Sequence, residues 1–435
     1  MTSVHFKDDE FQYGLEVALG SSYRQAADVG EVLATAGRIE DGDADSWVQE
    51  WTATAGAAWS AAIEAEQCRR RVSALAHFRR AATYYATGLY RISHSSEPER
   101  ELELWRRQRE CWEHAVDLFP APGERVAIPY EQTTLQAYFF RAPDSRPGES
   151  RPLVVVNNGS DGATSQMWVH GGAAASHRGY HWMTFDGPGQ QAALFEQGIP
   201  FRPDWEAVLT PVLDAMLARP DVDPDRIAVI GISQAGYWVP RALAFEHRFA
   251  AAVVDPGVVD VSSSWLDPLP EAMRNQLRNG QRTAFDREMH LVGLFSPQTA
   301  ATLRFRGKPY GVNGGSVFAL YETVGAYRLA EEEIEHITTP MLITDPEGEQ
   351  FWPGQSQQLY DHLTGPKALV RFRAGEGAGR HCEPLACAQR DTHLFDWLDQ
   401  YLGDHDPGVG LPTACHAPRR TVATIPSKTT HGSAS

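Results

Sequence analysis

The spacing of apolar residues divides the chain into a helical first part and an alternating second part. From about Phe11 to Phe119, apolar and aromatic residues recur every three or four positions, most clearly over 52–65 and 73–90. This spacing is typical of amphipathic helices. We therefore predict a helical N-terminal cap domain over residues 1–120. Five aromatic residues are expected to pack its helices together: Trp47, Trp51, Tyr84, Tyr85 and Trp105.

After residue 120 short apolar runs alternate with helical segments. Residues 124–129 and 135–141 indicate a β-hairpin. Further apolar runs predict buried strands at 152–157, 180–185, 226–232, 251–254, 341–344 and 369–372, with helices at 205–218 and 391–402 among them. Strands that are apolar throughout and alternate with helices describe a mostly parallel, doubly wound sheet covered on both faces, an α/β fold. Such sheets bind ligands at the carboxyl ends of their strands.

The sheet is expected to be interrupted by a long insertion. Residues 121–258 form the first part of the core and 338–402 the second part, and the helical character of 262–336 predicts a helical lid insertion over 259–337 that covers the site. The segment 403–435 is rich in Pro, Thr, Ser and Gly without periodicity, which predicts a disordered tail.

Composition narrows the possible partners and the location. The net charge of −17 disfavours nucleic acids and anionic membranes, and mildly disfavours strongly anionic substrates. We expect a small-molecule substrate, no nucleic acid and no membrane. No apolar run approaches 18 residues, and the first ten residues lack the layout of a signal peptide. Five scattered cysteines indicate reduced thiols, so a cytoplasmic location is expected.

One strand leads into a candidate nucleophile. A short β-branched run breaks at Gly231, presents Ser233 and continues through Ala235 and Gly236 into a helical sequence. A serine on such a sharp turn adopts a strained backbone and needs small neighbours. The turn places the backbone N–H of Gln234 at a helix N-terminus, where it can stabilise an oxyanion. A tight strand-to-helix turn without chemistry is the alternative interpretation.

Serine needs a base, and the base needs an orienting acid. In this strand order the histidine follows the last strand, and a glycine-rich loop there delivers His381. The acid should follow the penultimate strand. We predict Glu349, which falls where the acid of such a fold is expected, with Asp345 and Glu347 as alternatives.

The second oxyanion donor should come from the loop after the 152–157 strand. The backbone N–H of Ser160, or that of Asp161, fits this position, although 158–162 could be a turn only. The segment 186–190 is expected to shape its loop without chemistry. His381 with Cys382 and Cys387 matches no zinc spacing. No metal or organic cofactor is expected.

With these residues, the chain resembles the α/β-hydrolases grouped with 2,6-dihydroxypseudooxynicotine hydrolase and FrsA, and fungal polyketide-shortening hydrolases look like relatives. The resemblance spans about 43–402 and rests on 45–47, 79–85, 185–190, 231–241, 375–382 and 395–398. It implies the α/β-hydrolase fold and a Ser–acid–His triad. Relatives with such caps are often dimers, so a homodimer is expected.

Two positions depart from the family pattern. Ala235 stands where glycine is common, and Glu349 stands where relatives usually carry aspartate. Some members cleave a carbon–carbon bond beside a ketone, and at least one uses an extra acidic residue from the region after the nucleophile helix. That region contains three acidic residues that match no family position securely: Asp255, Asp260 and Asp267.

The functional hypothesis is a serine hydrolase. Ser233 attacks a carbonyl, His381 transfers the proton, Glu349 orients the imidazole, and the N–H groups of Gln234 and Ser160 hold the oxyanion. The cap and three aromatic residues, which could equally be core, suggest an apolar, aromatic substrate: Trp238, Trp265 and Phe295.

The resemblance implies an aryl ketone, β-diketone or polyketide-like substrate cleaved at a carbon–carbon bond, with ester hydrolysis as the close alternative. A biosynthetic acyltransferase or cyclase that uses the same triad is the second hypothesis. A non-catalytic ligand receptor on the same scaffold is the third.

Overall fold

The protein is described by a computed structural model over residues 5–312 and 315–403. Its centre is an eight-stranded sheet in the order β1-β2-β4-β3-β5-β6-β7-β8. Strand β2 is antiparallel to both of its neighbours, and β3 to β8 are mutually parallel. The strands are β1 (Glu124–Tyr130), β2 (Thr133–Phe140), β3 (Arg151–Asn157), β4 (His181–Phe185), β5 (Val222–Ile232), β6 (Ala251–Asp255), β7 (Met341–Pro346) and β8 (Lys367–Phe372).

Both faces of the sheet are buried, which explains why its central strands are apolar throughout. In β5, Val229 packs into the core on one face, and its neighbours Ala228 and Ile230 pack into the core on the other. One face is covered by α8 (Glu206–Leu217), α9 (Ala235–Leu243) and α16 (Gln355–His362), and the other by α6 (Ala173–His177) and α17 (Cys387–Leu402). The mostly parallel sheet predicted from the sequence is therefore confirmed.

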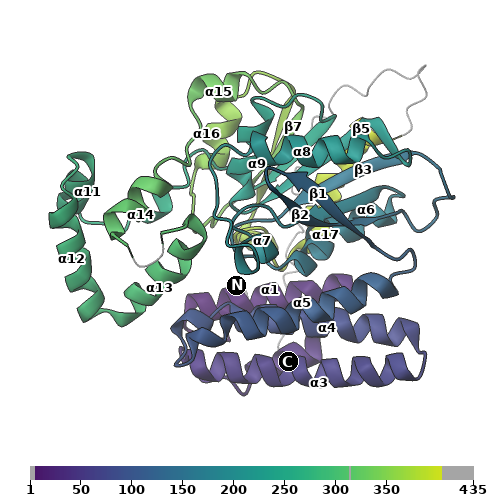
Figure 1. Ribbon diagram of the computed structural model, residues 1–435, viewed down its shortest axis with the longest axis horizontal. Helices are drawn as coiled ribbons and strands as arrows, with labels where there is room; N and C mark the ends of the chain where they lie inside the picture. Colours follow the sequence, from purple (N-terminus) through teal and green to yellow (C-terminus); the bar gives the residue numbers. More distant parts are fainter. Residues whose placement is uncertain (1–4, 313–314, 404–435) are drawn as a thin grey trace, which may run out of the picture. The chain divides into compact units, whose positions relative to one another are not determined.

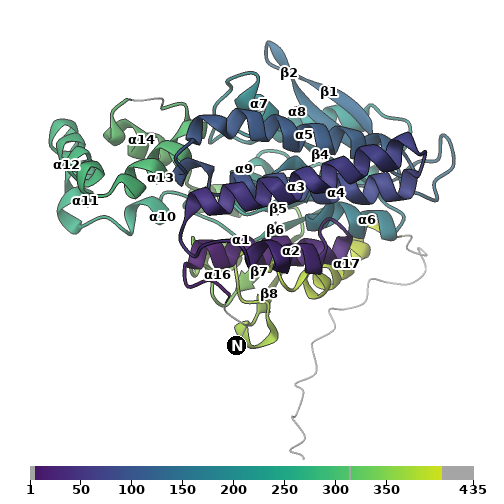
Figure 2. The ribbon, with the colours of Figure 1, turned by 90° about the horizontal axis from the view of Figure 1, so that it is seen from below.

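The chain before the sheet is helical, and its long helices lie against one side of the sheet (Figures 1 and 2). Aspartates cap three of these helices: the side chains of Asp8, Asp28 and Asp43 accept backbone N–H groups of the first turns. Trp47, Trp51 and Tyr84 are fully buried between the helices. The helices are α1 (Asp9–Ser21), α2 (Val29–Ala36), α3 (Ala44–Gln67), α4 (Arg71–Leu89) and α5 (Glu101–Leu118).

A second helical region connects β6 to β7 and lies beside the sheet (Figure 1). Its helices are α10 (Ser263–Leu266), α11 (Glu271–Arg278), α12 (Arg282–Phe295), α13 (Pro297–Gly307), α14 (Val317–Val324) and α15 (Glu331–Glu335). Parts of this insertion leave apolar side chains exposed to solvent: Phe295 is 88% exposed and Leu294 is 63% exposed.

None of the helices in the described part of the chain combines the length and apolar character that crossing a bilayer requires. The predicted tail over 403–435 lies, beyond Gly403, outside the described residues.

Candidate active site

Ser233 occupies a sharp turn between β5 and α9. Its backbone has a φ of 57°, in the left-handed region that side chains other than glycine rarely adopt. The Ser233 N–H donates to the Asp255 carbonyl at 2.6 Å, which ties the turn to the end of β6. A Cβ atom on Gly231 would lie 2.6 Å from the Ala235 carbonyl oxygen, and one on Gly236 would lie 1.9 Å from the Pro256 oxygen. The close approach of chains therefore requires glycine at 231 and 236, whereas Ala235 is accommodated.

The structure brings the predicted serine, histidine and glutamate into one hydrogen-bonded chain. Ser233 Oγ lies 2.9 Å from His381 Nε2. On the other side of the ring, His381 Nδ1 lies 2.8 Å and 3.0 Å from the two carboxylate oxygens of Glu349. The backbone N–H groups of Phe351 and Trp352 donate to the same carboxylate and fix its position. This is the geometry that a general base and its orienting acid require.

The electrostatics of the pair favour the charged form of each group in the presence of the other. Burial raises the pKa of Glu349, but the His381 charge and the hydrogen bonds from His381, Phe351 and Trp352 bring that pKa below its ordinary value. Burial lowers the pKa of His381, and the Glu349 charge and hydrogen bond outweigh it, so the pKa of His381 is raised. Glu349 therefore makes the imidazole a stronger base.

The two alternative acids are held elsewhere. Asp345, at the end of β7, pairs with Arg371 of β8 at 3.2 Å. Glu347 accepts the Ala374 N–H at 2.8 Å. Neither carboxylate contacts His381 in the described part of the chain, so Glu349 is the candidate that the fold brings to the histidine.

The loop after β3 lies directly against the serine. A Cβ atom on Gly159 would lie 2.8 Å from Ser233 Cβ, so only glycine permits this approach. The Gly159 N–H donates to the Asn158 side chain. The N–H groups of Ser160 and Gln234, in contrast, have no acceptor among the described residues. Both therefore remain available to a ligand at Ser233.

The segment after β4 fixes the position of the loop after β3 through hydrogen bonds. Gln190 donates from its amide to the carbonyl oxygens of Asn158 and Gly159, each at 2.7 Å. Asp186 accepts from Thr164 and from the buried Arg109 of α5. Gln190 belongs to the 186–190 segment that was expected to shape its loop, whereas no sequence signal pointed to Arg109. The Asp-Gly-Pro-Gly-Gln motif at 186–190 marks Gln190 in the sequence. No local pattern predicts that Arg109 of α5 reaches Asp186.

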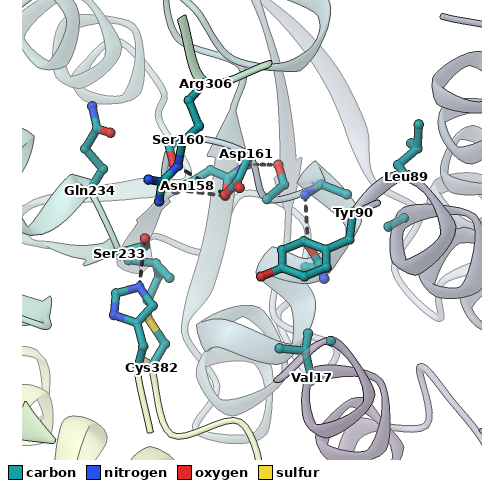
Figure 3. Close-up of a pocket in the computed structure, with 18 of the residues that line it drawn as sticks. Val17, Leu89, Tyr90, Asn158, Ser160, Asp161, Ser233, Gln234, Arg306 and Cys382 are labelled. Atoms are coloured by element: carbon teal, nitrogen blue, oxygen red, sulfur yellow. Dashed lines mark hydrogen bonds between the residues drawn. The ribbon is translucent and has the colours of Figure 1, made fainter. Parts of the chain in front are cut away.

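A cavity of about 300 Å³ opens over Ser233. Its lining includes residues of α10 and, as Figure 3 shows, of α1 (Val17), the end of α4 (Leu89) and α13 (Arg306). Its lining is mainly apolar and aromatic, including Val17, Leu89, Trp265, Phe305, Tyr310 and Phe351.

Only one of the three aromatic residues proposed for the pocket lines this cavity. Trp265 does so. Trp238 is fully buried and stacks on Trp205 with ring centroids 4.2 Å apart, so it belongs to the core. Phe295 lies on the solvent side of α12. Trp238 and Phe295 therefore do not line the cavity, and Trp238 follows the alternative interpretation of a core residue, because tertiary packing sets its neighbours.

None of the three acidic residues after the nucleophile helix lines the cavity. Asp255 accepts the Thr344 hydroxyl, and Asp260 accepts from Ser262 and pairs with Arg328. Asp267 makes no ion pair in the described residues. In those same residues no cluster of three His, Cys, Asp or Glu could hold a metal ion.

Behind the serine, Asp255 lies beside a second buried acid, Glu383. Both Glu383 oxygens and Asp255 Oδ2 lack a hydrogen-bond donor among the described residues. Burial, and next the negative charge of Asp255, raise the pKa of Glu383 well above its usual value. The site therefore favours the protonated form of Glu383.

The chain is similar to known hydrolases over most of its length. The hydrolase LUC6 of Fusarium sp is 29% identical over 412 residues, 92% of this chain and 98% of the relative. The 20-hydroxy-prefusarin hydrolase FUS2 of Gibberella moniliformis is 32% identical over 416 residues, 91% of this chain and 97% of the relative. Residues 209–292 match the prolyl oligopeptidase family.

Among solved structures, the crystal structure of 2,6-dihydroxy-pseudo-oxynicotine hydrolase has a TM-score of 0.68 at 18% identity. The match covers 88% of this chain and 95% of that one. It confirms the α/β-hydrolase fold, and together with the sequence matches it confirms the resemblance drawn from the motifs.

Proposed function

Because the chain belongs to the α/β-hydrolase family that includes 20-hydroxy-prefusarin hydrolase, and is itself a hydrolase, we propose a serine-dependent mechanism centred on Ser233. The substrate is an apolar, aromatic or polyketide-like small molecule with a carbonyl-activated bond. The observation that carries this proposal is the hydrogen-bonded chain from Ser233 through His381 to Glu349 at the floor of a 300 Å³ cavity.

In the first half-reaction Ser233 Oγ attacks the substrate carbonyl carbon while His381 Nε2 takes the hydroxyl proton. Glu349 stabilises the imidazolium through Nδ1–H. The backbone N–H groups of Gln234 and Ser160 donate to the oxyanion. Collapse of the tetrahedral intermediate expels the leaving group, which takes the proton from His381. Water, activated by the same histidine, then releases the acid from Ser233.

The bond that breaks depends on the leaving group. With a β-diketone the leaving group is an enolate carbon that His381 protonates, so a carbon–carbon bond is cleaved. With an ester it is an alkoxide. The name of the relative FUS2 states action on 20-hydroxy-prefusarin, and that of the structural relative states action on a pseudo-oxynicotine. These names and the aromatic lining favour a bulky ketone over a small aliphatic ester.

The test is a panel of aryl ketones, β-diketones and aryl esters of matched size, with products identified by mass spectrometry. Ser233→Ala should lower turnover at least about a thousandfold because the nucleophile is lost. Ser160→Ala is the matched control, since it keeps the backbone N–H and should change turnover little. Full turnover by Ser233→Ala would reject the mechanism.

The same panel separates hydrolysis from acyl transfer. Each reaction is repeated with an added amine or alcohol. Hydrolysis predicts the free acid as the main product in both cases, whereas a transferase or cyclase predicts that the amide, ester or lactone replaces it.

A further inference from the structure

The cavity lining holds one guanidinium group that forms no ion pair among the described residues, although the carboxylate of Asp161 lines the same cavity. Arg91, on the cavity wall, pairs with Glu10, and the buried Arg390 pairs with Asp391 at 3.2 Å. Arg306 of α13 lines the same cavity. Across residues 5–312 and 315–403 it forms neither an ion pair nor a hydrogen bond.

Two aromatic rings hold this guanidinium group in place. The Arg306 Cζ atom lies 5.9 Å from the ring centroid of Trp265 and 5.7 Å from that of Phe351. These distances permit cation–π attraction to both rings. Figure 3 shows the Arg306 side chain extending into the cavity towards the loop that carries Asn158 and Ser160. The guanidinium group thus lines the same cavity as Ser233 and has no ion-pair or hydrogen-bond partner among the described residues.

A half-buried guanidinium between rings has lost part of its water and retains its five N–H donors. Its planar geometry suits two oxygens of one anion, and the charge makes such hydrogen bonds about twice as strong as neutral ones. The large negative charge of the whole protein opposes polyanions at long range. A single local cation therefore fits a substrate with one negative charge.

We propose that Arg306 is a specificity-determining residue that binds an anionic oxygen of the substrate, either the ionised enol of a 1,3-diketone or a carboxylate. The inference rests on the proposed function to the extent that the same cavity binds the substrate. It goes further in giving the substrate a charge and in naming the residue that recognises it.

The test measures binding instead of turnover, so that it does not depend on the mechanism. Ser233→Ala protein is titrated calorimetrically with three aryl ketones. Benzoyltrifluoroacetone is an enolate at neutral pH, benzoylpropionate is a carboxylate, and dimethyl-blocked benzoylacetone cannot form the enolate between its carbonyls. The same titrations are made with Arg306→Met, Arg306→Lys and Arg304→Met added in turn. Arg304 is exposed on the same helix and does not line the cavity.

Arg306→Met should weaken binding of at least one anion about tenfold or more, and change binding of the blocked diketone less than about twofold. Arg306→Lys should bind the anion with an affinity between those of the unsubstituted Arg306 and of Arg306→Met, because lysine keeps the charge and loses the planar guanidinium. Arg304→Met should change neither the affinity for the anions nor that for the blocked diketone. The anion that loses affinity identifies the recognised group as enolate or carboxylate.

The proposal is overturned if neither anion binds more tightly than the blocked diketone. It is equally overturned if Arg306→Met weakens all three ligands alike or none of them. Labelling of Ser233 by a fluorophosphonate in the Arg306→Met protein reports separately on the mechanism and on correct folding. Loss of anion selectivity with labelling retained assigns the effect to Arg306 alone.

Discussion

The turn that carries Ser233 and the helical insertion that faces it are built in different ways. Around the serine, Gly231 and Gly236 permit backbone contacts that no larger residue allows, and Asp255 and Glu383 are fully buried. The insertion places exposed apolar residues on α12, and two of its cavity residues, Phe305 and Arg306, are only partly buried.

This difference separates reactivity from recognition. The reacting atoms are held by close packing that exists before any substrate binds, which is what efficient catalysis requires. The groups that face the substrate lie on elements with fewer buried contacts, where local opening costs less free energy. We therefore expect substitutions near the serine to affect chemistry and folding, and those in the insertion to affect ligand choice.

The largest effect is expected at the acid. Glu349→Gln leaves the shape of the side chain but removes the charge that stabilises the imidazolium, so kcat should fall about a hundredfold to ten-thousandfold. Asp345→Asn should lower kcat less than about threefold, because Asp345 pairs with Arg371 on the strand surface. The comparison uses kcat on any substrate found in the panel, and equal losses in both variants would contradict the assignment.

Next comes a pair of glycines, one from each region. Gly236→Ala would place a methyl group 1.9 Å from the Pro256 oxygen and should lower the free energy of unfolding by about 3 kcal/mol or more. Gly293→Ala, within α12, meets only Ala300 at 3.4 Å and should raise that free energy by up to about 1 kcal/mol. Urea unfolding measures both, and similar destabilisation by the two would remove the contrast between the regions.

The third effect depends on pH. With its folded pKa raised well above 4.5, Glu383 stays protonated in the folded protein while the unfolded chain loses that proton. Its contribution to stability is therefore full below about pH 4.5 and decreases as pH rises towards the folded pKa, by up to about 1.4 kcal/mol per pH unit.

Glu383→Gln keeps a neutral group of the same shape and removes this dependence. The variant should gain stability over the wild type between about pH 5 and about pH 7 in urea unfolding. Glu376→Gln, at an exposed position in the same loop, is the control, and its curve of unfolding free energy against pH should run parallel to that of the wild type. A Glu383→Gln curve that also runs parallel would show that the carboxyl is ionised in the folded protein.

Local pattern was sufficient for the sheet and for the turn at Ser233, because apolar strands and small residues around a serine are signals within a few positions. The local pattern also placed three candidate acids after the penultimate strand, but it did not determine which of them orients His381. The choice depends on Arg371 in the next strand and on the N–H groups of Phe351 and Trp352, which only the folded chain brings into place.

Recognition was much less predictable than reactivity. The sequence left open whether Trp238 and Phe295 face the substrate or the core, and in the structure Trp238 lies in the core and Phe295 is exposed to solvent. Arg306 gave no signal as a site residue, and Gln190 was expected only to shape its loop. Each gains its position from a distant segment, Arg306 through Trp265 and Gln190 through the loop at Asn158.

The central claim is that one hydroxyl, that of Ser233, is activated by His381. It is tested most directly by reacting the native protein with a fluorophosphonate and locating the adduct by peptide mass spectrometry. We expect a single modified residue, Ser233, and loss of the adduct in the His381→Ala variant. Stable modification at another serine, or undiminished labelling without His381, would contradict the account.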